Sequence, residues 1–411
     1  MYNILIFIIG FISSQKIVVF GEINIGELFF GMALLFKIKE LHIPKNSNNL
    51  LLLLLLWFMS QFMADLVNQT EIVKALKGML APIFILITLV GLTTFFYDKF
   101  EKLPIFLFGV FVGMWFRVMM SSQFYAGIPW KWGVGPAVAL CFFTWLEFYN
   151  VRNKKMYLSL GTAIFVLISL ANSSRSLAIF VLAASVLCAF SERIQGMVFY
   201  KRLNTSVSGR IYFLMILFLC LFAIDRAAAA LFSFGPFLDM LPLEDAYKYS
   251  RQAESKWGVI VGGRTELLVS IEAFLDSPLF GHGSWAENSL YTYRHLDMKD
   301  ASGGMLIDFF TAENNVKSYL IPTHSYLMGA LVWGGFFAGL FWLKLLGIFV
   351  GGFLKNKVLS SPLLVYITIW MIWNILFSPL GSDARWITSV LLWVYMIMQP
   401  VNNNEKGLLI K

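Results

Sequence analysis

Long runs of hydrophobic residues, separated by short polar segments, follow one another along most of the chain. A helix of about 20 apolar residues crosses the core of a bilayer, so this pattern predicts an all-α, polytopic membrane protein. We expect about 12 spanning helices, at residues 3–14, 17–36, 49–66, 72–96, 104–121, 131–149, 156–172, 174–190, 211–229, 324–350, 362–379 and 383–400. The first run is as short as a signal peptide but lacks the basic start and the small-residue cleavage site of one, so we expect a retained helix.

One region is too polar to cross a membrane. Residues 230–323 form a large loop between nine predicted helices in residues 1–229 and three in residues 324–411, which also hold a C-terminal tail. The chain is thus expected to consist of two helical blocks joined by one loop domain.

Within this loop, apolar residues recur at helical spacing over residues 265–276, which predicts an amphipathic helix with Thr265 as its N-cap. Ser277-Pro278 is expected to end the helix, and Gly281-His282-Gly283 to form a turn. We expect residues 284–320 to be irregular.

Composition supports a membrane protein, because 58% of the residues are hydrophobic and only 14% are charged, against about a quarter charged in soluble proteins. The net charge of +8 does not indicate a nucleic-acid partner, because the basic residues gather in short loops on one predicted side. These residues are Lys37, Lys39, Lys45, Arg152, Lys154, Lys155, Arg193, Lys201, Arg202, Arg210, Lys355 and Lys357. Positive loops stay in the cytoplasm, so the acidic loop 230–323 is expected to face the periplasm from a bacterial inner membrane.

Known metal and nucleotide motifs are missing from the sequence. Cys141, Cys188 and Cys220 all lie in apolar runs, as small core residues do. The chain has no Asp-x-Asp, no His-Glu-x-x-His and no Walker-type glycine loop. We therefore expect no metal and no cofactor.

Five groups that carry or accept a proton are predicted at the outer ends of the helices. Arg117 lies near the end of the fifth run, Arg175 begins the eighth, and Arg264 lies in the loop. His324 opens the tenth run and Arg385 the twelfth. Ionisable groups at membrane depth are usually functional, although an arginine at a helix end also reaches for lipid headgroups.

Arg175 and His324 are both expected in the first turn of a helix. A helix N-terminus favours phosphate, and guanidinium groups bind phosphate oxygens in pairs. We therefore expect a diphosphate at the outer surface, held by Arg175, Arg264, Arg117 and Arg385. His324 is expected to be neutral beside these cations and to act as a general base; the alternative is a histidine that only anchors its helix.

Four short motifs occur in a fixed order. They are Ser174-Arg175-Ser176, Gly263-Arg264, Ser277-Pro278-Leu279-Phe280-Gly281-His282-Gly283, and Thr323-His324-Ser325-Tyr326-Leu327 before a glycine-rich run that ends in Phe341-Trp342. In this order and sidedness the chain resembles the bacterial O-antigen ligase and polymerase family. The resemblance covers about residues 160–350 by motif and the whole chain by helix count and loop placement.

The resemblance implies a metal-independent, inverting glycosyltransferase of the C-type membrane architecture. Its donor would be an undecaprenyl-diphosphate-linked glycan, used at the periplasmic face. Carried over by position, Arg175 and Arg264 would be catalytic ligands of the donor diphosphate, and His324 would be the base that activates the acceptor hydroxyl.

Two activities within the family stay open. A polymerase passes the growing glycan to another lipid-linked repeat unit, whereas a ligase passes it to lipid A–core. The Thr-His-Ser-Tyr entry and the Gly-Gly-Phe-Phe-Ala-Gly-Leu-Phe-Trp run favour a polymerase of a surface polysaccharide, with a chain-length regulator as a further partner. A polysaccharide flippase or transporter is the alternative of another class, although such proteins usually show internal repeats and charged sites near the bilayer midplane.

Overall fold

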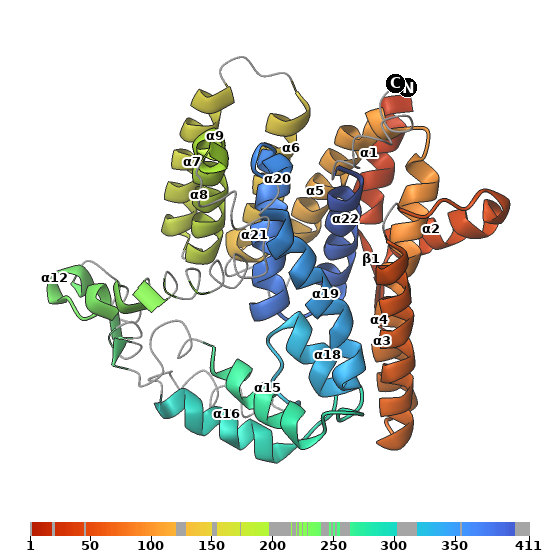
Figure 1. Cartoon of the computed structure of the whole chain (residues 1–411), viewed down its shortest axis with the longest axis vertical. Helices are drawn as coiled ribbons and strands as arrows, with labels where there is room; N and C mark the ends of the chain where they lie inside the picture. Colours follow the sequence, from red (N-terminus) through yellow and green to blue (C-terminus); the bar gives the residue numbers. More distant parts are fainter. Residues whose placement is uncertain are drawn as a thin grey trace.

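The structure is a computed structural model of the whole chain. It describes residues 2–18, 21–44, 47–120, 129–149, 154–172, 174–196, 264–301, 319–353 and 356–398, and scattered positions between 215 and 254. The regular secondary structure of these residues is helical apart from one two-stranded hairpin. Figure 1 shows α15 (Thr265–Asp276), α16 (Ser289–Ala301) and α18 (Tyr326–Gly334) together below the helical body.

Nine of the predicted helices are confirmed as helices. They are α1 (Tyr2–Ser13), α3 (Asn48–Val67), α4 (Ile72–Phe96), α5 (Leu103–Met120), α6 (Gly135–Phe148), α7 (Lys154–Ala171), α8 (Arg175–Ala189), α21 (Pro362–Phe377) and α22 (Ser382–Met398). Short helical segments connect some of them: Ile38–Glu40, Phe100–Lys102, Trp130–Val134, α9 (Ser191–Gly196), α12 (Gly235–Leu238) and α20 (Asn356–Leu359). Most of the run predicted at 211–229 lies outside the described residues.

The lengths and composition of the helices support a membrane protein. Among the described residues, five helices are long and apolar enough to cross a bilayer: Asn48–Val67, Ile72–Phe96, Phe100–Met120, Lys154–Ala171 and Phe336–Phe353. Five further apolar helices have 10–17 residues. The class of all-α membrane protein is therefore supported, while the count of 12 spans and the side of the loop stay predictions.

The span predicted at 17–36 is wrong. Its first half is an antiparallel hairpin of β1 (Lys16–Val18) and β2 (Glu22–Asn24), and only α2 (Ile25–Phe36) is helical. The polar residues of β2 start a new helix, because the Glu27 carboxylate accepts a hydrogen bond of 3.0 Å from the backbone N–H of Asn24. This bond satisfies a free donor at the N-terminus of α2.

The span predicted at 324–350 is also wrong as a single helix. It consists of α18 and α19 (Phe336–Phe353), which are separated at Gly335 with φ of 79°. A Cβ at this glycine would lie 2.1 Å from the Leu279 carbonyl oxygen, so only glycine fits.

The two helices then run side by side as a hairpin. The rings of Tyr326 and Trp342 lie 5.1 Å apart, and a Cβ on Gly339 would lie 2.3 Å from the Leu331 side chain. Of the two helices, only α19 is long and apolar enough to cross a bilayer, and α18 turns back toward the end of α21. Two further glycines of α19, Gly347 and Gly351, do not pack against another helix, since a Cβ on either would meet no atom within 4 Å.

Two apolar cores hold the described elements together. The large core fills the helical body, and its biggest fully buried side chains are Trp342, Trp386 and Trp393. A small second core joins α15, α16 and α18 through Val269, Ala273, Tyr291, Ile321 and Val332. This second core fixes the loop segment against the body.

The predictions for the loop are confirmed in part. The amphipathic helix has the expected bounds, but its N-cap is Arg264, and Thr265 is the first, buried residue of the helix. The turn at Gly281 and Gly283 is confirmed by φ of 63° and 84°. The irregular segment 284–320 is wrong for residues 289–301, which form α16; this helix lacks an apolar stripe and is held by its contact with α15.

Candidate functional site

The segment that carries His324 is fixed from three sides. The Ser270 hydroxyl of α15 donates to the Pro322 carbonyl oxygen at 2.7 Å. The backbone N–H of Ile321 donates to the Ala286 carbonyl at 3.0 Å, and the Ser325 hydroxyl donates to the Ile375 carbonyl of α21 at 2.7 Å. The backbone around His324 is thus held between α15, the following loop and the end of α21.

His324 does not lie in the first turn of a helix. Ser325 is the N-cap of α18, and its hydroxyl accepts from the Met328 N–H at 3.0 Å. His324 therefore precedes the cap, and its half-buried ring is placed by the extended segment. Arg175, in contrast, is the first residue of α8, as expected, and follows the N-cap Ser174.

Four charged or titratable residues from distant parts of the chain act on His324. Burial lowers the pKa of His324. The charges of Arg264, His295 and Lys131 lower this pKa further, and the carboxylate of Glu266 raises it. The neutral imidazole, which is the form that accepts a proton, is therefore favoured.

Glu266 and His295 join the first turn of α15 to α16. The His295 Nε2 atom lies 3.6 Å from the Glu266 Oε1 atom, and the His295 side chain is only 13% exposed. From the sequence alone, His295 reads as a loop residue and Glu266 as part of a solvated helix face. Both sit beside His324 because α16, which the sequence did not predict, packs on α15.

Arg264 lies on an aromatic wall made by two helices. Its guanidinium carbon is 5.6 Å from the ring centroid of Trp373 in α21, and Trp373 packs at 5.2 Å against Phe180 of α8. Burial lowers the pKa of Arg264, although an arginine stays charged in proteins. Arg175, on the same helix as Phe180, stacks over Phe232 at 5.9 Å. Arg175 thus begins α8, and Arg264 contacts α21 near its C-terminal end.

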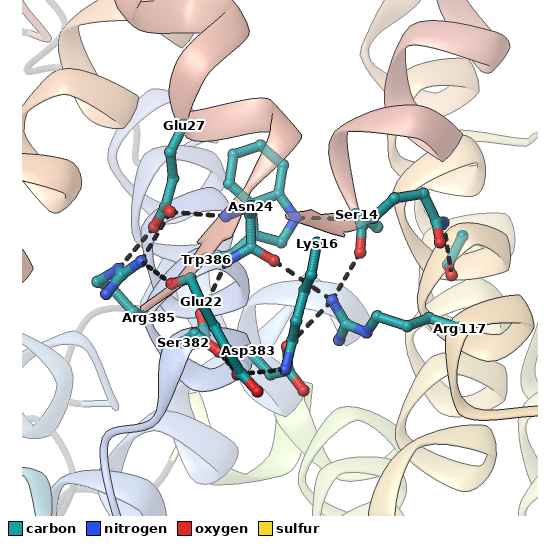
Figure 2. Close-up of polar contacts among 12 residues, drawn as sticks. Ser14, Lys16, Glu22, Asn24, Glu27, Arg117, Ser382, Asp383, Arg385 and Trp386 are labelled. Carbon is teal, nitrogen blue, oxygen red and sulfur yellow. Dashed lines mark hydrogen bonds and ion pairs between the residues drawn. The ribbon is translucent and has the colours of Figure 1, made fainter. Parts of the chain in front are cut away.

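Arg117 and Arg385 belong to a different cluster, shown in Figure 2. Arg385 forms a two-bond ion pair with Glu27, at 2.6 and 2.7 Å. Arg117 lies 3.1 Å from Asp383 and donates to the Ser14 carbonyl at 2.6 Å. The structure does not bring these two arginines into the group around His324.

Lys16 completes this cluster by pairing with Glu22 at 2.7 Å and Asp383 at 2.8 Å. Three cations thus face three carboxylates, which ties the β1–β2 hairpin to the start of α22. The sequence pattern did not indicate this cluster, because Glu22 and Glu27 lie inside a run that resembles a spanning helix.

A cavity of about 920 Å³ lies between the hairpin, α3 and α4 on one side and α18 and the loop segments on the other. Its wall is mainly apolar. It includes His295 and the residues on both sides of His324, namely Thr323 and Ser325, but neither Arg175 nor Arg264. The two arginines therefore lie outside the wall of this cavity.

Two further findings bear on the nature of the site. Among the described residues, no three His, Cys, Asp or Glu side chains gather as metal ligands would. No family model, curated protein or solved structure matches the chain.

Proposed function

We propose that the chain is a membrane-embedded glycosyltransferase that polymerises undecaprenyl-diphosphate-linked repeat units of a surface polysaccharide at the periplasmic face. One observation carries the proposal: charged or titratable residues from three segments far apart in sequence, at residues 131, 264–266 and 295, act on the half-buried His324 and leave its neutral form favoured, and two of these segments meet where His295 lies 3.6 Å from Glu266. Groups with shifted pKa values and a specific charged partner are typical of active sites.

In this proposal His324 accepts the proton of the acceptor hydroxyl. The oxygen then forms a bond to the anomeric carbon of the donor glycan, and the bond from that carbon to the diphosphate oxygen breaks with inversion. The leaving undecaprenyl diphosphate keeps the electron pair. Arg264 and Arg175 are assigned to the diphosphate, where they stabilise the negative charge that grows as the bond breaks.

Arg117 and Arg385 are assigned a structural role, since both engage carboxylates. The proposal needs only the two arginines along α8 and α21. Lys131 adds a cation that, like Arg264, acts on His324.

The test uses the full chain, purified and reconstituted in liposomes with lipid-linked repeat units, with product length read on a gel. A ladder of longer lipid-linked glycans from this donor alone supports a polymerase. Transfer that begins only after lipid A–core is added identifies a ligase. If glycan crosses the membrane with no new glycosidic bond, the chain is a transporter, and the enzyme proposal is wrong.

A further inference from the structure

The apolar part of the cavity reaches the outer surface of the helical body. Trp57 of α3 and Phe84 of α4 line it from inside. Leu76 and Leu80 of α4 also line it, yet they are 45% and 37% exposed on a helix that is apolar enough to cross a membrane. Side chains that face both the cavity and the lipid place an opening along α4.

Two tryptophans in the cavity wall carry unused hydrogen-bond donors. Trp285 and Trp333 pack with ring centroids 4.9 Å apart. The Nε1–H groups of both are buried and have no acceptor among the described residues. Buried indole N–H groups usually find a partner, so these two are suited to the oxygens of a ligand.

The backbone of Trp285 is held in an unfavourable conformation. Its φ is 55°, in the left-handed region that large side chains rarely adopt. Ser284, the residue before Trp285, is held by two side chains of α3. Its hydroxyl donates to the Asp65 carboxylate at 2.8 Å and accepts from the Gln61 amide at 2.8 Å. Strain that the surroundings enforce is concentrated at functional sites, and here it presents an indole to the cavity.

The polar part of the cavity adjoins the proposed base. His295, Thr323 and Ser325 line it, and Lys77, Arg385 and Glu22 add charged groups. A ligand with its chain along α4 would bring its head to the segment that carries His324. The volume of about 920 Å³ is in the range of sites for one ligand, roughly 300–1,000 Å³, and so suits one hydrocarbon chain.

We propose that this cavity binds the prenyl chain and the oxygen-rich head of a second lipid substrate, with Trp285 and Trp333 donating to the head. Its role as the glycan acceptor rests on the proposed function; its capacity to bind a prenyl diphosphate does not. A single-chain lipid in this cavity also favours polymerisation, because the acceptor of that reaction is itself prenyl-linked.

The test measures binding of a photoactivatable farnesyl diphosphate to the full chain in lipid nanodiscs, with labelled peptides mapped by mass spectrometry. Gly329→Leu fills the cavity, and the nearest atom to its new Cβ is the Thr323 hydroxyl at 3.9 Å, so the backbone accepts the change. We expect labelling of α4 and of the segment around Trp285 in the parent chain, and a loss of about tenfold or more in this variant.

The matched control is Gly347→Leu, the same change at an exposed position of α19 with no atom within 4 Å. It should label as the parent does. Trp285→Phe and Trp333→Phe keep a ring but remove a donor, and each should weaken binding about fivefold. Unlabelled undecaprenyl phosphate should compete, and phosphatidylglycerol should not.

Labelling that maps elsewhere, that Gly329→Leu leaves unchanged, or that phosphatidylglycerol removes equally well would overturn the inference. Labelling needs no turnover, so it separates the two proposals. If the cavity labels but no glycan is transferred, the lipid site stands and the glycosyltransferase does not. If transfer proceeds in Gly329→Leu as in the parent chain, the function stands and the lipid site does not.

Discussion

Glu27 and Arg385 form a buried ion pair with two hydrogen bonds between residues 358 positions apart in the chain. The Glu27 side chain is fully buried, and that of Arg385 is 10% exposed. The pair joins α2 to α22, two helices at opposite ends of the sequence.

Removal of one partner should destabilise the fold. In Glu27→Gln the Arg385 charge stays buried without a carboxylate, which costs about 3–5 kcal/mol. Thermal unfolding in detergent should therefore begin at a clearly lower temperature. Glu40→Gln, at an exposed position, is the control. A Glu27→Gln chain as stable as the parent would show that Arg385 has another partner.

His324→Ala should abolish glycan transfer while the fold persists. A positioned general base contributes about 10²–10⁴ in rate, so we expect roughly a 1,000-fold loss in the liposome assay. His42→Ala is the control, because His42 stacks on Tyr97 at 3.5 Å, away from the site. Parent-level transfer in His324→Ala would refute the assignment of the base.

Arg264→Lys should also be severely impaired. The lysine keeps a positive charge but loses the planar fork that binds two phosphate oxygens and stacks on Trp373. We expect transfer to fall about 100-fold, the usual loss when one preorganised donor is removed. Arg294→Lys, where the side chain is 58% exposed, should transfer glycan normally. Full turnover in Arg264→Lys would mean that charge alone suffices there.

The pH dependence of the transfer rate should show the lowered pKa of His324. Burial lowers the pKa of this histidine, so the rate should fall with acid only below the ordinary range of a histidine, about 6.5. Arg264, His295 and Lys131 act in the same direction, and Glu266 opposes them.

Among the residues that the structure describes, Glu266 is the one whose charge favours the protonated form of His324, and Glu266→Gln removes it. The acid limb of the rate profile should therefore move to lower pH in this variant. Glu272→Gln, on the same helix beside Arg294 at 3.9 Å, should leave the limb where it is. A limb that moves to higher pH in Glu266→Gln would contradict this arrangement.

The sequence predicted most of the helices and the amphipathic α15, because runs of apolar residues and helical spacing are local signals. It failed at 17–36, where Glu22 and Glu27 are accommodated only because Lys16 and Arg385 pair with them. It failed again at 324–350, where the break at Gly335 is imposed by contact with Leu279. Each error involves a contact between residues that are distant in sequence, Glu27 with Arg385 in the first and Gly335 with Leu279 in the second.

The same difference between local signals and long-range contacts applies to the candidate site. His324, Arg264 and Arg175 are predicted as site residues from short motifs and from their expected sidedness. Glu266 and His295 were not assigned a role, because α16 has no apolar stripe by which a helix could be recognised. Their closeness to His324 depends on the packing of α15 on α16, which no local pattern carries.

The tight fit of Gly335 against Leu279 also has a consequence for the order of assembly. The turn at residues 278–283 is synthesised before α18 and α19. Its Pro278 carbonyl accepts from the Phe336 N–H at 2.8 Å, and its His282 N–H donates to the Val332 carbonyl at 2.8 Å. The helical hairpin therefore closes on a turn that has been synthesised before it. A turn that is misplaced leaves the hairpin, and with it the segment that carries His324, without the surface against which they pack.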